Sequence, residues 1–288
     1  HAISRSLNSP VVVLAQKNTH AQAILKNDPH IEDVIELDRK GFLNVIKKIK
    51  SKNFKQSYIY SDSLRLYIIS KLSNIKEIFH YKFFSKEGKN FFKTANEFTE
   101  KLLNVKIDSQ PKIYCSAQDT TNAQQKYHIL KETKNIVCGI SASGPTKRWD
   151  VKNYIKLFEN LSSKFPCKFF LAGGLHDEHL IKEILNSSFG NKCISFSKMT
   201  INETIPIISA CKYYIGNDTG WGHISSALNL QSLFLFMDSP PSSYGAYSKN
   251  ISIIVPKGLT IETCSHNSRG KDKISVDHVF KRALKILD

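Results

Sequence analysis

Short apolar segments alternate with amphipathic segments along the whole chain. The apolar run Asn135–Ser141 is followed by a segment that begins at Asp150, in which apolar residues recur every three or four positions. The same order repeats until the last helical pattern, Val276–Leu287. Strands that are apolar on both faces and separated by helices belong to parallel sheets covered on both sides. The sequence therefore predicts an α/β fold.

The patterns can be assigned to elements and then to two domains. The expected strands are Pro10–Ala15, Val34–Leu37, Ser57–Tyr60, Asn135–Ser141, Cys167–Ala172, Lys192–Phe196, Tyr213–Ile215, Ser232–Met237 and Ile251–Val255. The expected helices are Thr19–Asn27, Gly41–Lys50, Ser63–Leu72, Lys89–Leu103, Asn122–Lys131, Asp150–Lys164, His176–Leu185, Thr200–Ala210, Trp221–Leu228 and Val276–Leu287. A length of 288 residues fits two domains, which we place at residues 1–133 and 134–288. The last helix is a candidate to pack back on the first domain, and ligands are expected at the carboxyl ends of the strands.

The charge balance indicates an anionic partner. The 41 Lys and Arg residues outnumber the 25 Asp and Glu residues, a formal net charge of +16. Nucleic acid, an anionic membrane face and a phosphorylated substrate all fit this charge. The alternative is that the lysine-rich composition partly reflects coding bias.

No apolar run approaches the ~18 residues of a membrane span. The six cysteines are scattered without zinc-site spacing, so we expect reduced thiols, no metal and a cytoplasmic location.

A hydroxyl-rich loop follows the strand Asn135–Ser141. The run from Gly139 to Trp149 contains Ser141, Ser143, Gly144, Thr146 and Lys147, and it precedes a helix. It is not a Walker A motif, because Pro145 and Thr146 follow Gly144 where Lys and Ser or Thr would be required. Hydroxyls and cations between a strand and a helix can bind a diphosphate without a metal. An ordinary polar loop with solvated charges is the alternative.

A glycine-rich segment follows the strand Tyr213–Ile215. It runs Gly216-Asn-Asp-Thr-Gly-Trp-Gly-His223, where the glycines allow close backbone approach to a ligand and Thr219 can cap the next helix. Asp218 is suited to orient a cation or sugar hydroxyls, and Gly220 and His223 lie beside it in sequence. The alternative is that Asp218 and Thr219 only cap the helix while His223 packs beneath it.

Two further segments carry weaker signals. In Gly173-Gly-Leu-His-Asp-Glu-His179, Glu178 can accept hydrogen bonds from a ribose, whereas the two histidines lack metal-site spacing. Basic and aromatic residues interleave from Arg65 to Lys93, which suits a phosphorylated acceptor, lipid headgroups or single-stranded nucleic acid. No nucleic-acid-binding motif accompanies this stretch, so we expect no nucleic-acid partner. A solvated surface with a few core aromatics is the alternative.

Taken in order, these motifs resemble glycosyltransferase family 9, the ADP-heptose:lipopolysaccharide heptosyltransferases. The resemblance rests on Ser141–Trp149, on Ala172-Gly-Gly with Asp177-Glu178, on Gly216–Gly220 with His223–Leu230, and on Ala21–Asp38. It implies a GT-B fold of two Rossmann-like domains facing across a cleft. It also implies inverting, metal-independent transfer of heptose from ADP-heptose to the phosphate-rich Kdo–lipid A inner core, with the enzyme at the cytoplasmic face of the bacterial inner membrane.

The resemblance also assigns roles to individual residues. Ser141, Ser143, Gly144, Thr146 and Lys147 would hold the diphosphate, and Lys147 would offset the charge that builds on the departing ADP. Glu178 would bind the ribose. The phosphate and sugar side would be lined by Asp218, Thr219, Gly220 and His223.

The family's first strand and the Gly-Asp loop after it, which supplies the general base, have no counterpart in these 288 residues. The first residue is His1 rather than Met, and His1–Arg5 is similar to the helix after that loop, so we expect the natural N-terminus upstream. An inverting transfer needs a proton acceptor, and we therefore expect this chain to bind donor but transfer sugar poorly. The alternatives are a family 9 enzyme that uses another nucleotide sugar and a catalytically silent nucleotide-sugar or membrane-surface binding protein.

Overall fold

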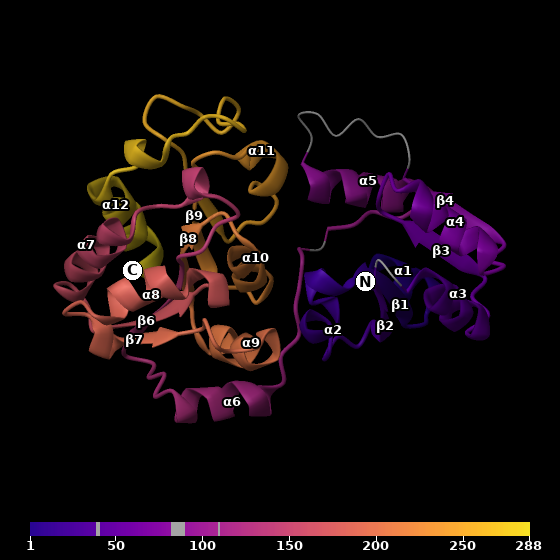
Figure 1. Cartoon of the computed structure of the whole chain (residues 1–288), viewed down its shortest axis with the longest axis horizontal. Helices are drawn as coiled ribbons and strands as arrows, with labels where there is room; N and C mark the ends of the chain where they lie inside the picture. The colour runs from indigo at the N-terminus through magenta and orange to yellow at the C-terminus, as the bar shows by residue number, and fades with distance from the viewer. Residues whose placement is uncertain (39–40, 82–89, 109) are drawn as a thin grey trace. The chain divides into compact units, whose positions relative to one another are not determined.

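The computed structural model describes residues 1–38, 41–81, 90–108 and 110–288. Two compact units make up the chain, His1–Asp108 and Ser109–Asp288, and both are α/β as expected (Figure 1). The boundary lies after Asp108 rather than after residue 133. The reason is that α6 (Ala117–Lys126) packs against α9 (Ile201–Ala210) of the second unit.

The N-terminal unit contains two pairs of parallel strands with helices between them. Its strands are β1 (Val11–Gln16) paired with β2 (Ile31–Leu37), and β3 (Gln56–Ile59) paired with β4 (Glu77–His80). Its helices are α1 (Ala2–Leu7), α2 (Ala21–Ile24), α3 (Phe42–Ser51), α4 (Leu64–Leu72) and α5 (Phe91–Leu103). The apolar positions of β2, α3 and α4 share one core, which contains Ile35, Leu37, Val45, Ile46, Ile49, Ile69 and Ile75.

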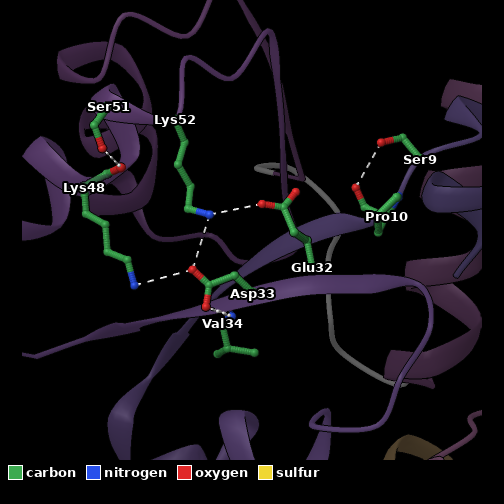
Figure 2. Close-up of polar contacts among 8 residues, drawn as sticks. All are labelled: Ser9, Pro10, Glu32, Asp33, Val34, Lys48, Ser51 and Lys52. Atoms are coloured by element: carbon green, nitrogen blue, oxygen red, sulfur yellow. Dashed lines mark hydrogen bonds and ion pairs between the residues drawn. The ribbon is translucent and has the colours of Figure 1, made fainter.

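An ionic cluster links the start of β2 to the end of α3. Figure 2 shows Lys48 and Lys52, from the end of α3, converging on Asp33 at 3.5 and 3.4 Å, while Lys52 also reaches Glu32 at 3.1 Å. Cations in the last turn of a helix also interact favourably with the helix dipole. These two lysines are therefore engaged within the fold.

The C-terminal unit is built on one six-stranded parallel sheet. Its strands are β5 (Lys134–Gly139), β6 (Cys167–Ala172), β7 (Cys193–Ser195), β8 (Tyr213–Asn217), β9 (Gln231–Leu235) and β10 (Ile251–Ile254). They lie in the order β10-β9-β8-β5-β6-β7. The chain proceeds outward from β5 on one side and returns to β8 on the other, so the topological switch point lies between these two strands.

Helices cover both faces of this sheet (Figure 1). One face packs against α7 (Val151–Ser162), α8 (Glu178–Leu185) and α12 (Val276–Leu287), and the other against α9 and α10 (Gly220–Ala227). A short helix, α11 (Pro241–Tyr244), follows β9. Single 3-10 turns lie at Lys17–Thr19, Pro145–Lys147, Leu175–Asp177, Gly190–Lys192 and Lys271–Lys273. The large core includes Phe158 stacked on Phe169 at a centroid distance of 3.9 Å.

Most expected elements are present, but the helices α1 and α11 were not among those expected, and three other elements also differ. β4 was not expected, because its Glu77-Ile-Phe-His80 sequence lies within the stretch interpreted as basic and aromatic. α2 is only four residues long. α6 begins at Ala117 rather than at Asn122, because the Ser116 hydroxyl accepts a hydrogen bond from the Asp119 N–H and caps the helix there.

All six cysteines lie in the described part of the chain and are free. None of the helices described in these ranges is both long and apolar enough to cross a membrane.

Candidate functional site

Four loops leave the carboxyl ends of β5, β6, β8 and β9, which are neighbours at the centre of the C-terminal sheet. They carry the segments that begin at Ile140, Gly173, Asp218 and Phe236. In open parallel sheets ligands bind at this edge, beside the switch point. The loops after β5 and β8 thus lie on the two strands that flank the expected binding position.

Asn217, the last residue of β8, clamps the loop that follows β5. Its Oδ1 accepts a hydrogen bond from the Trp149 N–H at 3.0 Å, and its Nδ2 donates to the Ile140 and Ser141 carbonyls at 3.0 and 3.2 Å. Trp149 is itself buried and donates from Nε1 to the Ile274 carbonyl at 2.9 Å. Both ends of the 141–148 loop are therefore fixed to the sheet.

Between these anchors the loop presents polar groups to solvent. Ser143 is exposed, and Ser141 and Lys147 are partly exposed. Within the described residues, the Lys147 ammonium has no hydrogen bond or ion pair. Gly144 has an extended backbone, and a Cβ placed on it would meet nothing within 4 Å. This stretch therefore has room and an available cation for an anionic ligand.

The Thr146 hydroxyl is hydrogen-bonded within the protein rather than open to a ligand. Its hydroxyl donates to Asp238 Oδ2 at 2.6 Å, and Oδ1 of the same carboxylate accepts the Arg269 N–H at 2.9 Å. Burial acts to raise the pKa of Asp238, but these two hydrogen bonds and the nearby Lys147 charge outweigh it, and the pKa is lowered. Thr146 thus ties the loop after β5 to the loop after β9, and in this arrangement its proton is not offered to a ligand.

The glycine-rich segment places Asp218 and His223 in direct contact. Asp218 Oδ1 lies 3.5 Å from His223 Nε2, and Asp218 Oδ2 accepts the Ser239 hydroxyl at 2.8 Å. Thr219 occupies the N-cap position of α10, yet no side chain caps that helix; the Thr219 hydroxyl lies 3.4 Å from the Tyr214 hydroxyl. Thr219 is therefore the N-cap residue of α10, as expected, but without a side-chain hydrogen bond to the helix, and the alternative that Asp218 only caps the helix is wrong.

The three glycines of this segment have different roles. A Cβ on Gly216 would overlap the backbone of Gly139 in the neighbouring strand, and one on Gly222 would lie 2.6 Å from the Phe234 ring. A Cβ on Gly220, at the first position of α10, would meet nothing within 4 Å. Two glycines therefore serve internal packing, and only Gly220 leaves open space at the helix start.

Asp177 and Glu178, the acidic pair after β6, have different partners. Asp177 accepts the Gly174 N–H at 3.0 Å and pairs with Arg148 at 3.5 Å, which links this loop to the one after β5. Glu178, at the first position of α8, lies 3.6 Å from Lys182 and 3.5 Å from Lys198. The Glu178 carboxylate remains partly exposed, and both lysines lie close enough to pair with it.

No group of three or more His, Cys, Asp or Glu side chains arranged to hold a metal occurs in the described ranges.

A separate cavity of about 300 Å³ lies in the N-terminal unit, at the carboxyl ends of β1 and β2. Arg65 of α4 reaches across it and donates to the Asp38 carbonyl at 3.4 Å. The cavity is lined by Gln16, Lys17, Asn18, Leu37, Asp38 and Arg65. Its wall carries two cations, two amides and the Asp38 carboxylate, so it presents polar groups of both charges.

The basic and aromatic stretch is partly core. Phe79 stacks on Tyr58 at 5.0 Å and Tyr81 is buried, whereas Lys71 and Lys76 are exposed. His80 Nε2 contacts the Ser61 carbonyl at 2.8 Å. Residues Lys82, Phe83, Phe84, Lys86 and Lys89 of that prediction lie outside the described residues.

Four residues of the C-terminal edge were not assigned a role from the sequence: Asn217, Asp238, Ser239 and Tyr247. Asp238 and Ser239 directly follow the expected strand Ser232–Met237, so the rule that residues after parallel strands meet at one edge would have found them. Tyr247 lies in the connection between α11 and β10 and carries no such signal. Its hydroxyl is 2.6 Å from His223 Nδ1.

Comparisons with known proteins agree with the resemblance seen in the motifs. Residues 84–273 match the family described as glycosyltransferase family 9 (heptosyltransferase). The chain is 24% identical over 277 residues to lipopolysaccharide heptosyltransferase 1 of Campylobacter coli, covering 85% of this chain and 80% of the relative. These matches extend across both units of the structure.

Solved structures share the fold. The structure of the Escherichia coli ADP-heptose lps heptosyltransferase II superposes with a TM-score of 0.82 at 18% identity, covering 99% of this chain and 93% of that one. The E. coli heptosyltransferase WaaC with ADP gives a TM-score of 0.72 at 15% identity, over 96% and 100% of the two chains. The fold is thus GT-B, as the family resemblance implied.

Proposed function

Because this chain belongs to glycosyltransferase family 9, and is therefore a glycosyltransferase, we propose that it transfers a heptose during synthesis of the lipopolysaccharide inner core. The observation that carries the proposal is the clamped loop after β5, which presents Ser141, Ser143 and Lys147 beside the switch point. Among the residues that the structure describes, none pairs with the Lys147 ammonium. The lipopolysaccharide and ADP-heptose in the names of its relatives support this substrate class.

The proposed donor is ADP-heptose. Its diphosphate would lie between the 141–147 loop and the start of α10, where Gly144 and Gly220 leave space and backbone N–H groups favour anions. Glu178 would accept hydrogen bonds from the ribose. Asp218, Thr219 and His223 would line the phosphate and sugar side. Thr146 would support this site through Asp238.

The proposed chemistry is inverting and needs no metal ion. As the glycosidic bond to ADP breaks, negative charge builds on the diphosphate, and a fixed cation lowers the energy of that state. Lys147 would supply it, because its ammonium forms no hydrogen bond or ion pair among the described residues, although its charge also acts on Asp238.

The proposed acceptor is the anionic Kdo–lipid A core or its heptosylated form. The cavity at the carboxyl ends of β1 and β2 would hold phosphate or carboxylate groups of that acceptor through Lys17 and Arg65, which outnumber the one carboxylate of its wall, Asp38. A net charge of +16 also favours an anionic membrane surface, so we place the enzyme peripherally on the cytoplasmic face of the inner membrane.

Calorimetric titration with ADP and with ADP-heptose, in EDTA, tests the donor site. We expect metal-free binding by the wild type and at least tenfold weaker binding by Lys147→Ala, since a hydrogen bond to a charged group is worth about 1.5–3 kcal/mol. Lys212→Ala, which removes an exposed lysine at the opposite edge of the sheet, is the matched control. Equal affinity in the wild type and Lys147→Ala, or binding that requires Mg²⁺, would contradict the proposal.

A further inference from the structure

One side of α4 is apolar and open to solvent. Leu64, Ile68 and Leu72 follow one another at intervals of four residues and so lie on one side of the helix, where their exposed fractions are 56, 42 and 52%. The opposite side of α4 packs inward through Ile69, which is fully buried. A helix that only covers its sheet carries polar residues on its outer side. The apolar stripe formed by Leu64, Ile68 and Leu72 is therefore not explained by the packing of this unit.

Cations accompany the apolar stripe, and no acidic residue interrupts it. Lys71, on the same side of α4, and Lys76, after the helix, are both exposed. The Lys71 ammonium lies 5.8 Å from the centre of the Tyr67 ring. Residues 63–76 include no Asp or Glu, and α3, which packs against α4, carries three lysines and no acidic residue of its own. The surface beside the stripe is therefore positively charged.

The apolar stripe begins beside the proposed acceptor cavity. Arg65, the residue after Leu64, lies in the wall of that cavity and donates to the Asp38 carbonyl at 3.4 Å. Its guanidinium also lies over the Phe42 ring of α3, 5.6 Å from the ring centre. These contacts fix the start of α4 next to the end of β2. From there the stripe extends for about 12 Å, at a rise of about 1.5 Å per residue.

An anionic lipid bilayer matches this surface better than a protein partner does. Protein interfaces are depleted of lysine and use about 20–30 residues on each side. Exposed leucine and isoleucine beside lysines instead suit the boundary of a bilayer, where apolar side chains enter the acyl region and lysines meet anionic headgroups. A lysine can extend its ammonium toward those headgroups while its methylene groups stay among apolar side chains.

We propose that α4 docks the enzyme on an anionic membrane surface, with the apolar stripe in the bilayer boundary and Lys71 and Lys76 at the headgroups. This inference rests on the proposed function, which places the enzyme on a membrane and gives it a lipid-linked acceptor. Docking through the stripe brings the acceptor cavity to the bilayer surface, where the sugar core of a lipid anchored in that bilayer lies. Arg65 connects the two features, because it belongs to α4 and lines the cavity.

Co-sedimentation with lipid vesicles at low salt tests the apolar stripe. We expect the wild type to bind phosphatidylglycerol vesicles but not phosphatidylcholine vesicles, because the lysines need an anionic headgroup. The combined changes Leu64→Gln, Ile68→Gln and Leu72→Gln should weaken binding to phosphatidylglycerol by about tenfold or more, since they remove the groups that enter the bilayer. The matched control replaces three other exposed apolar residues with Gln, and it should bind as the wild type does; these residues are Leu7, Val105 and Leu130.

The charged part of the surface is tested with single lysine variants. Lys71→Gln and Lys76→Gln should each weaken binding to phosphatidylglycerol about fivefold, the contribution of one lysine close to an anionic leaflet. Lys152→Gln and Lys285→Gln remove the same charge from exposed positions in the C-terminal unit and should change binding little. Equal losses in all four variants would show that net charge alone attracts the protein, and they would overturn the assignment of the surface to α4.

The remaining outcomes separate this inference from the proposed function. If the wild type binds phosphatidylglycerol vesicles and the triple Gln variant of α4 binds them equally well, the inference is overturned while the membrane placement stands. A wild type that is dimeric by analytical ultracentrifugation and monomeric in the triple variant would assign the stripe to a second copy of the chain, which also overturns it. If the wild type binds neither kind of vesicle, the membrane placement fails together with the docking surface. If it binds phosphatidylglycerol vesicles but no ADP, the proposed donor site fails and the docking surface stands.

Discussion

The Asn217 side chain accepts a hydrogen bond from the Trp149 N–H at 3.0 Å, across 68 residues of sequence. The same amide donates to two carbonyls at the start of the loop that Trp149 ends. A single buried side chain thus holds the loop closed from both sides. The geometry of the proposed phosphate loop therefore depends on a side chain of β8 as well as on the loop's own contacts, such as that of Thr146 with Asp238.

Asn217→Ala is expected to lower the free energy of unfolding and to abolish ADP binding. It leaves two buried backbone groups, the Trp149 N–H and the Ile140 carbonyl, without that partner, and each costs about 1–3 kcal/mol. Urea denaturation and calorimetry measure the two effects. Asn135→Ala is the matched control, because that buried amide donates to the Leu130 and Thr133 carbonyls at the far end of β5. Asn135→Ala should lose stability but keep its ADP affinity. If this control also lost ADP binding, the effect of Asn217→Ala could be ascribed to general destabilisation rather than to the loop after β5.

The C-terminal sheet could be predicted closely because its strands are buried on both faces. β6 and α12 have the residues expected for them, Cys167–Ala172 and Val276–Leu287. The Asp150 cap is also present, with its side chain accepting the Lys152 N–H at 2.9 Å. In these segments the local pattern and the tertiary packing favour the same structure.

Partnerships distant in the sequence could not be predicted. Thr146 was expected to face the donor, but its hydroxyl donates to Asp238, 92 residues away. The register that brings those loops together depends on the strand order, which periodicity does not specify. In the N-terminal unit β4 was missed for a related reason, since a four-residue strand with Glu77 and His80 at its ends has no clear alternation.

Gly220→Ala and Gly222→Ala are expected to behave in opposite ways. The Gly220 position has helical geometry and open space, so alanine should add about 0.4–1 kcal/mol of stability or be neutral. If a diphosphate occupies that space, ADP binding should weaken about tenfold. Gly222→Ala must displace the Phe234 ring and should cost about 1–3 kcal/mol. Thermal unfolding and calorimetry give both quantities, and full ADP affinity in Gly220→Ala would place the diphosphate elsewhere.

Asp238 should stabilise the fold most at neutral pH. Its pKa is lower in the folded protein than the ordinary value, despite burial, because the Arg269 N–H and the Thr146 hydroxyl donate to it. A lowered pKa contributes stability above the unfolded value of about 3.9, and this contribution is lost as the pH falls through the folded value. The difference in unfolding free energy between the wild type and Asp238→Asn should therefore shrink between pH 7 and pH 3. Asp277→Asn, which removes an exposed partner of Lys281, should change stability little at either pH, and a constant difference for Asp238→Asn would refute the assignment.

Glu178→Gln tests whether that carboxylate binds the ribose. A charged hydrogen bond to a ribose hydroxyl predicts about tenfold weaker ADP binding in the variant. The loss should be much smaller with 2′,3′-dideoxy-ADP, because the hydroxyls that Glu178 would bind are absent. The matched control is Glu183→Gln on the exposed side of the same helix. An equal loss with both nucleotides would mean that Glu178 acts by holding Lys182 and Lys198 rather than by contacting the ribose.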